Sequence, residues 1–291
     1  MAVLILGGIY YIVTHLGSLS GSHTIATTTI SGNQAQTISS CTAIKNPGTY
    51  NLTANITTTN QSSACIQISS SSVVFNGNGH SIMGNGPYIF TPPYSYGVSL
   101  RSVSNVVIRH LTVSKFSYGI YLNNSYNNML SNDTVSNMTL SGIYLAGSKN
   151  NIVTHDNVTG VNGPAGGVSL QNGGNNTVSY SAVKYNTLFG IMVNSTGNGF
   201  YNDNLVGNPT DMVCAPGTGY ASYNKFANTS CYVYNYCHFA TCSEQNLPAT
   251  PQFTVLQSNV TECGQIISPG SYSLANDLNI PDYISSSLPL R

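Results

Sequence analysis

The middle of the chain alternates apolar and polar positions, and this pattern repeats every 22 to 25 residues. Each repeat opens with Gly, an aliphatic residue, any residue and a second aliphatic residue, as in Gly119-Ile120-Tyr121-Leu122. The opening glycines are Gly97, Gly119, Gly142, Gly167 and Gly190. An Asn stands eight residues after each of them, at Asn105, Asn127, Asn150, Asn175 and Asn198. Because no stretch keeps the i, i+3, i+4, i+7 spacing of an amphipathic helix, the pattern predicts short strands separated by turns.

A repeat of this length, with about three strands in each copy, indicates a solenoid in which every coil pairs with its neighbours. We therefore expect an all-β parallel β-helix of about eight coils over residues 41–245. In such a coil Ile120 and Leu122 face inward, and Tyr121 faces outward. The repeated Gly is expected where the backbone needs a positive φ or a close approach. The repeated Asn is expected at a turn.

The first part of this region carries a more specific signature. Residues 41–52 read Cys-x-x-Ile-x-x-Pro-Gly-x-Tyr-x-Leu, and the strand Cys65-Ile66-Gln67-Ile68 and the turn at residues 76–82 follow. Together these segments resemble the opening of NosD-type proteins, and the repeats resemble the short coils of the pectate-lyase-like superfamily. The resemblance spans about residues 41–235 and implies a right-handed parallel β-helix. It implies no single activity, because this fold hosts lyases, hydrolases, adhesins and structural proteins.

The two ends of the chain differ from the repeats. Residues 1–21 begin with an apolar run and predict a signal peptide or a short membrane anchor, with a buried apolar strand as the alternative. Residues 22–40 and 246–262 are expected to be linkers. The segment Cys263–Leu274 repeats Cys41–Leu52 with a shift of 222 residues. Residues 263–291 are therefore either the start of a second β-helix module or a strand for capping or assembly.

Charged side chains are scarce, with eight basic and eight acidic residues and a net charge of zero. Nucleic acid is excluded as a partner because little is available to neutralise phosphates, and a membrane is expected only at the N-terminal segment. Low charge favours self-association or a glycan coat. Eleven Asn-x-Ser/Thr sequons fit such a coat: Asn51, Asn55, Asn60, Asn123, Asn132, Asn137, Asn157, Asn175, Asn194, Asn228 and Asn259.

Seven cysteines point to an oxidising compartment, and with the apolar N-terminus they predict an extracellular or cell-surface protein. Cys41 and Cys65 lie about one coil apart and are expected to form a disulfide. A second group allows three pairings: Cys214, Cys231, Cys237 and Cys242. A zinc site made of Cys231, Cys237, His238 and Cys242 is the alternative, although its spacing matches no standard zinc pattern. We expect no metal and no cofactor.

Two carboxylates are the only catalytic candidates in the regular coils. Asp133 and Asp156 each stand 14 residues after their coil's Gly, so they should stack about 5 Å apart. That separation would suit a retaining glycosidase pair or a calcium site. Equivalent positions hold Leu111 and Ser181, which favours instead a solvated turn ladder in which Asp replaces Asn.

Tyr121 and Tyr144 are the candidates for ligand binding, since both are expected to point outward on adjacent coils. Their rings could stack on sugars, make contacts in an assembly, or have no special role. The sequence thus predicts an exported, non-catalytic structural or adhesive β-helix protein that associates with itself or binds cell-surface glycans. The alternative is a carbohydrate-active enzyme, either a polysaccharide lyase or a glycoside hydrolase.

Overall fold

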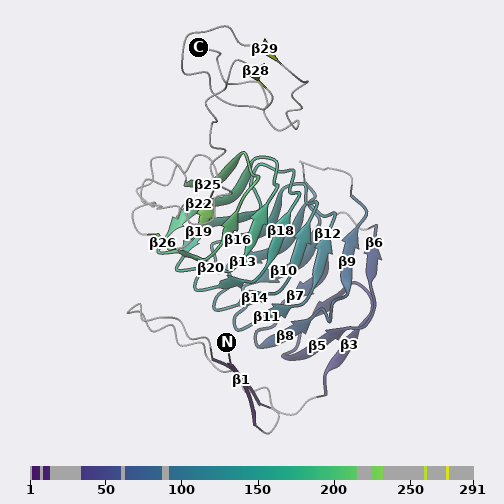
Figure 1. Cartoon of the computed structure of the whole chain (residues 1–291). Helices are drawn as coiled ribbons and strands as arrows, with labels where there is room; N and C mark the ends of the chain where they lie inside the picture. The colour runs from purple at the N-terminus through teal and green to yellow at the C-terminus, as the bar shows by residue number, and fades with distance from the viewer. Residues whose placement is uncertain are drawn as a thin grey trace. The chain divides into compact units, whose positions relative to one another are not determined.

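The structure is a computed structural model that describes residues 2–6, 9–13, 34–59, 63–86, 92–214, 224–227, 229–231, 259–260 and 273–274. The chain divides into two compact units, Met1–Glu244 and Gln245–Arg291. Three parallel sheets in the first unit form a solenoid, and each regular coil gives one strand to each sheet. Figure 1 shows these strands stacked coil on coil.

The three sheets hold eight, nine and eight strands, which agrees with the predicted number of about eight coils. The first sheet consists of β4 (Thr42–Ile44), β7 (Ala64–Ile68), β10 (Tyr96–Arg101), β13 (Tyr118–Asn123), β16 (Ser141–Ala146), β19 (Val168–Gly174), β22 (Phe189–Thr196) and β25 (Thr210–Cys214). The second consists of β3 (Gln36–Ile38), β5 (Gly48–Leu52), β8 (Val73–Asn76), β11 (Val107–Arg109), β14 (Met129–Ser131), β17 (Ile152–Thr154), β20 (Thr177–Ser179), β23 (Gly199–Tyr201) and β26 (Lys225–Ala227). The third consists of β6 (Ile56–Thr58), β9 (Ser81–Gly84), β12 (Thr112–Ser114), β15 (Thr134–Ser136), β18 (Asn157–Thr159), β21 (Ala182–Lys184), β24 (Asn204–Leu205) and β27 (Ser230–Cys231).

Two short strand pairs lie outside these sheets. β1 (Ala2–Leu6) and β2 (Ile9–Val13) pair antiparallel, and no described residues form a helix long and apolar enough to span a membrane. In the second unit, β28 (Asn259–Val260) pairs in parallel with β29 (Ser273–Leu274). The strand β3 pairs with β5, so the solenoid includes part of the stretch expected to be a linker at residues 22–40. The signal peptide or anchor and the linker at 246–262 stay predictions.

The core consists of ladders of aliphatic side chains inside the coils. Ile120 pairs in register with Val98 on one side and Ile143 on the other, and all three are fully buried. Leu122 continues a second ladder in the same sheet. The inward and outward assignments predicted from alternation are therefore confirmed for this strand. Stacked apolar rows of this kind remove nearly all of their side-chain surface from water, which is the main source of stability.

The repeated glycines mark close approaches between coils. Gly142 has an ordinary φ, and a Cβ added there would collide with Val158 Cγ1 and lie 2.6 Å from the carbonyl oxygen of Gly167. Gly119 has the same surroundings one coil earlier. Of the two reasons expected for these glycines, close packing therefore applies, and positive φ does not.

The repeated Asn residues occupy the turn between the first and second sheets. Asn127, Asn150 and Asn175 have φ values of 55°, 56° and 53°, a left-handed conformation that Asn tolerates. The fifth copy differs, because Gly197 takes the left-handed position and Asn198 occupies the next one.

The residues that directly follow the left-handed position in successive coils form a buried ladder of Asn side chains. The sequence pattern did not predict this ladder. Asn151 Oδ1 accepts the backbone N–H of Asn128 at 2.9 Å and its Nδ2 at 2.9 Å, and Asn151 bonds Asn176 in the same way. The ladder runs through Asn128, Asn151, Asn176, Asn198 and Asn224. The ladder supplies hydrogen-bond acceptors for buried backbone N–H groups at this turn, which lie outside the strand pairing.

Candidate functional site

The outer face of the first sheet gathers tyrosines from consecutive coils. Tyr96 pairs in register with Tyr118, and Tyr121 pairs with Tyr144. Alternation turns Tyr121 and Tyr144 outward. Tyr96 and Tyr118 lie on the same face because the alternation is interrupted at the buried glycine that follows each of them, and their rings contact Tyr121. Tyr94 lies just before β10, and its ring is nearly perpendicular to that of Tyr118, with the centroids 5.7 Å apart. We call these five residues the tyrosine platform.

The rings of the platform are in direct contact. Tyr118 lies at the centre, with its ring centroid 5.4 Å from Tyr96 and 5.4 Å from Tyr121. Tyr144 lies 5.3 Å from Tyr118 and stacks on Tyr121 at 5.6 Å with an interplanar angle of 25°. These separations fall within the range that aromatic pairs prefer. The platform is thus a continuous aromatic surface fixed on a rigid sheet.

One cation borders the platform. The exposed Arg101 places its guanidinium carbon 5.9 Å from the centroid of the Tyr96 ring, a cation–π distance. Its Nε donates to Ser99 Oγ at 3.5 Å, and Ser99 is fully buried beneath it. Arg101 therefore offers a positive charge beside aromatic rings, where a carboxylate or a hydroxyl-rich ligand would lie.

Four phenols of the platform, those of Tyr96, Tyr118, Tyr121 and Tyr144, stay protonated at ordinary pH. Burial raises the pKa of Tyr96, Tyr118, Tyr121 and Tyr144, because loss of water disfavours the charged phenolate. For Tyr118 the neighbouring Tyr144 adds to this effect. Each of these four phenols can therefore donate a hydrogen bond to a sugar oxygen.

The sequence pattern identified two of the five platform residues. Tyr121 and Tyr144 lie between inward-facing aliphatic residues, so alternation predicted that their side chains point outward. Tyr96 and Tyr118 were missed, although each directly precedes the Gly of its repeat. Tyr94 belongs to the insertion before Gly97, where no repeat indicated a direction.

Asp133 and Asp156 lie on adjacent coils, as expected, but in the interior. Each is 1% exposed, so the prediction of a solvated turn ladder is wrong. Asp133 Oδ1 accepts the N–H of Leu111 at 2.9 Å, and Asp156 Oδ1 accepts the N–H of Asp133 at 2.7 Å. Ser181 and Asp203 continue the row in later coils. The carboxylates therefore bond the backbone at a coil corner and cannot reach a ligand outside.

Burial also changes the protonation of these acids. It raises the pKa of Asp133 to about 7 and that of Asp203 to about 8. The pKa of Asp156 is raised by burial and further by the charge of Asp133. The Oδ2 atoms of Asp133 and Asp156 are buried without a hydrogen-bond partner, which suits a neutral carboxyl better than a carboxylate.

Cys41 and Cys65 form a disulfide with a Cα–Cα distance of 4.4 Å, which links the first two coils. Cys214 is also disulfide-bonded. The side chains of Cys231, Cys237, His238 and Cys242 lie outside the described residues, so the pairing and the zinc alternative stay open there. Within the described ranges, no group of three His, Cys, Asp or Glu could hold a metal ion.

Most sequon side chains in the coils are accessible. The exposed acceptors are Asn55, Asn132, Asn137, Asn157 and Asn175. Asn51, Asn123 and Asn194 are half-buried. Asn60 and Asn228, and the side chain of Asn259, lie outside the described residues. Glycosylation stays a prediction.

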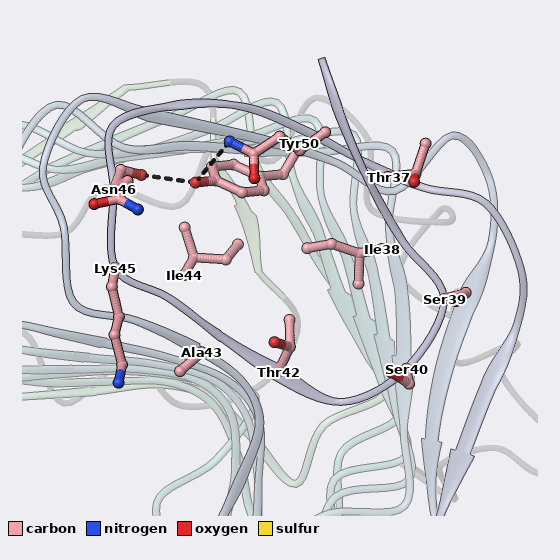
Figure 2. Close-up of a pocket in the computed structure, with 11 residues that line it drawn as sticks. Thr37, Ile38, Ser39, Ser40, Thr42, Ala43, Ile44, Lys45, Asn46 and Tyr50 are labelled. Carbon is pink, nitrogen blue, oxygen red and sulfur yellow. Dashed lines mark hydrogen bonds between the residues drawn. The ribbon is translucent and has the colours of Figure 1, made fainter. Parts of the chain in front are cut away.

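A cavity of about 370 Å³ opens at the first coil (Figure 2). Ile38 and Ile44 point into it, while Lys45 points away (Figure 2). The Tyr50 hydroxyl donates to the carbonyl oxygen of Asn46 at 3.0 Å and accepts from Gln36 Nε2 at 3.3 Å. The cavity is the lumen of the first coil, and its lining contains no carboxylate, histidine or cysteine.

The sequence matches the family model described as "Right handed beta helix region" over residues 95–267. This chain belongs to the right-handed β-helix family. The match confirms the predicted fold, and it does not single out the NosD-type proteins. No curated protein matches the chain at a significant level.

Solved structures with similar folds include three carbohydrate-active proteins. The catalytic domain of a GH87 α-1,3-glucanase variant bound to nigerose has a TM-score of 0.44 and 15% identity, covering 66% of this chain and 39% of that chain. The A-module of the Azotobacter vinelandii mannuronan C-5 epimerase AlgE6 has a TM-score of 0.48 and 13% identity, covering 62% and 51%. An alginate lyase from Paenibacillus sp. has a TM-score of 0.36 and 13% identity, covering 56% and 70%. At sequence identities this low, the similarity extends to the fold alone.

These comparisons correct the functional prediction. The sequence favoured a non-catalytic structural or adhesive rod, whereas the similar β-helix structures are a glucanase, an epimerase and a lyase. The names of these structures agree better with the alternative prediction, a carbohydrate-active enzyme, than with the rod. The chain matches about two fifths of the length of the glucanase domain. A substrate and a reaction for this chain therefore have to be argued from its own residues.

Proposed function

We propose that this protein is a carbohydrate-active enzyme that holds a polysaccharide on the tyrosine platform. The single observation that carries the proposal is the contact of five tyrosine rings across consecutive coils, with Tyr118 at their centre. Pyranose rings present C–H faces that stack on aromatic rings, and their hydroxyls bond to phenols. A row of such rings along the coils fits a linear chain of sugars.

The surroundings of the platform favour eliminative cleavage of a uronate-containing polysaccharide over glycoside hydrolysis. Hydrolysis uses two carboxyl groups on either side of the glycosidic bond. The described carboxylates are Asp133, Asp156, Asp203 and Asp211, and each is 1% exposed. Arg101 instead offers a cation that neutralises a uronate carboxylate and so makes the C5 proton more acidic. In the elimination solvent hydroxide takes the C5 proton, the C4–O4 bond breaks, and a platform phenol protonates the leaving O4 and is itself reprotonated by water.

The proposal includes an extracellular or cell-surface location. The Cys41–Cys65 disulfide supports it, because such bonds persist mainly in oxidising environments. The apolar segment at residues 1–21 and the exposed sequons support it as well.

The test is a screen of the full chain against soluble polysaccharides with and without uronate units. Elimination is followed by the ultraviolet absorbance of the new C4=C5 double bond, and hydrolysis by new reducing ends. We expect unsaturated products from at least one uronate polymer. Release of reducing ends without the double bond would contradict elimination, and no reaction with any polymer would contradict the proposal.

A matched set of variants locates the site. Tyr121→Ala together with Tyr144→Ala should lower kcat/KM about tenfold or more, since each ring lost removes roughly 1 kcal/mol of contact. Tyr126→Ala is the control, because Tyr126 is a tyrosine of the same solenoid that is 40% exposed and lies outside the platform. Equal activity of the platform variant and the control would show that the platform does not bind the substrate.

A further inference from the structure

Two tyrosines on one coil occupy backbone positions where this amino acid is unfavourable. Tyr180 has a φ of 52°, and Tyr185 has a φ of 54°. The left-handed region is disfavoured for side chains other than Asn and Gly, and for a bulky residue it is an outlier. Both residues border β21, one at each of its ends.

Other coils use small or polar residues at the same two corners. The row of Tyr180 consists of His110, Asn132, His155, Tyr180 and Asn202, all with positive φ. The row of Tyr185 consists of Lys115, Asn137, Gly160, Tyr185 and Gly207. Asn or Gly would therefore meet the conformational need at both positions.

Packing does not explain these two rings. Tyr180 is 49% exposed and Tyr185 is 58% exposed, so neither gains the burial that normally stabilises an aromatic side chain. An exposed ring held in an unfavourable conformation points to a role outside the folding of the chain.

Each ring is nevertheless supported from one side. The Tyr180 ring stacks on the His155 ring with centroids 5.1 Å apart and an interplanar angle of 13°. The Tyr185 ring lies against Gly207, where an added Cβ would collide with it. Support from behind and exposure in front are what a stacking surface for a ligand requires.

The surface between the two rings is low and polar. Ala182 lies there in register with Asn157 on one side and Asn204 on the other. Lys184 lies near Tyr185, in register with Thr159. Ser181 and the three residues of β21 separate the two tyrosines, so their Cα atoms lie at most roughly 16 Å apart.

We propose that Tyr180, Tyr185 and the intervening β21 form a second polysaccharide-binding site, which we call the β21 cradle. It takes a neutral, hydroxyl-rich chain of pyranose sugars, with one sugar stacked on each ring and hydroxyls bonded to Asn157 and Lys184. The cradle lies on the third sheet, whereas the tyrosine platform lies on the first. It therefore does not depend on the function proposed for the platform.

The chemistry of the surface argues against a peptide ligand. A peptide that adds a strand needs a free sheet edge, but β21 lies within its sheet, and the Ala182 N–H already donates to the carbonyl oxygen of Asp156 at 2.8 Å. A peptide helix needs an apolar groove, and the outward residues of β21 are Ala182 and Lys184.

The experiment is affinity electrophoresis of the full chain in gels containing dextran, starch, mannan or xylan, with thermal unfolding measured in parallel. The protein is produced without N-glycans, because Asn157 is also a sequon. The test variant is Tyr180→Asn with Tyr185→Gly, which installs the residue types of other coils. Tyr126→Asn is the control, and Tyr121→Ala with Tyr144→Ala reports on the platform.

We expect the wild-type protein to be retarded by at least one of these polymers. The Tyr180→Asn, Tyr185→Gly variant should weaken that binding about tenfold or more while its Tm stays equal or rises. The control and the platform variant should keep this retardation. Three results would overturn the proposal: no retardation of the wild type, unchanged binding by the test variant, or loss of binding only together with a lower Tm.

Discussion

Asp156 Oδ1 accepts the backbone N–H of Asp133 across one coil at 2.7 Å, and both residues are 1% exposed. Two carboxyl groups are thus used inside the solenoid as acceptors for backbone N–H groups. Neutral residues perform the same task elsewhere, because Ser181 Oγ accepts the N–H of Asp156 at 3.2 Å. The position requires a short side chain with an oxygen that accepts a hydrogen bond, and it does not require a negative charge.

The first prediction concerns Asp156→Asn, which keeps the acceptor oxygen and removes the ionisable group. At about pH 8 the variant should be more stable than the wild type. In the wild type, Asp156 loses its proton on unfolding at this pH, which favours the unfolded state, and Asn has no proton to lose. Near pH 4 the two should unfold at similar denaturant concentrations. A stability difference independent of pH, measured by urea unfolding, would contradict the structural role of the neutral carboxyl.

The second prediction is the pH dependence of the wild-type protein. The pKa of Asp133 is raised from 3.8 to about 7 and that of Asp203 to about 8, so the folded state holds these protons more tightly than the unfolded state. Their contribution to stability is full below the unfolded pKa and is lost as pH rises through 7 to 8. Each pKa unit corresponds to about 1.4 kcal/mol, so the two shifts together set an upper limit on the loss of about 10 kcal/mol. Guanidinium unfolding from about pH 4 to about pH 9 should show stability falling. A rise over this interval would show that burial does not govern these acids.

The third prediction compares neighbouring asparagines. Asn151→Ala should lower the free energy of unfolding by roughly 3 kcal/mol, because it removes bonds to the backbone and side chain of Asn128 and to the Ser125 carbonyl. Asn150→Gly should have little effect, since Asn150 is exposed and Gly accepts a φ of 56°. Denaturant unfolding of the two variants checks the difference. Equal losses would mean that the amide ladder does not stabilise the solenoid.

The fourth prediction separates packing from backbone conformation at glycines. Gly142→Ala should destabilise the protein by about 2 kcal/mol, because the new methyl group meets Val158 and the carbonyl of Gly167. Gly79→Ala meets nothing within 4 Å, and its φ of 77° should lead to a smaller loss. Thermal unfolding of both variants, compared with the wild type, measures the two effects. A larger loss at Gly79 would indicate that coil packing tolerates the added methyl group at Gly142.

Periodicity predicted the coils because each one is built from the same short-range rule. Ile120 and Leu122 alternate with Tyr121, and this alternation sets inside and outside without reference to the rest of the chain. The spacing of Cys41 and Cys65 by about one coil similarly placed two residues side by side, and a disulfide joins them.

The exposure of corner residues could not be predicted in this way. The rule that assigns faces in a strand does not extend to a turn, where the backbone changes direction. Asp133 therefore looked like a solvated turn residue, although its side chain points into the interior and bonds the neighbouring coil.

The sequence by itself determined the solenoid, the length of its coils, the inward ladders and the outward direction of Tyr121 and Tyr144, because these depend on contacts between neighbouring repeats. The tertiary structure decided which outward side chains meet. Tyr96 comes from the coil before that of Tyr118, and Tyr144 from the coil after it, yet both contact Tyr118. Such convergence depends on where turns and insertions place whole side chains in space, and local periodicity carries no information about that.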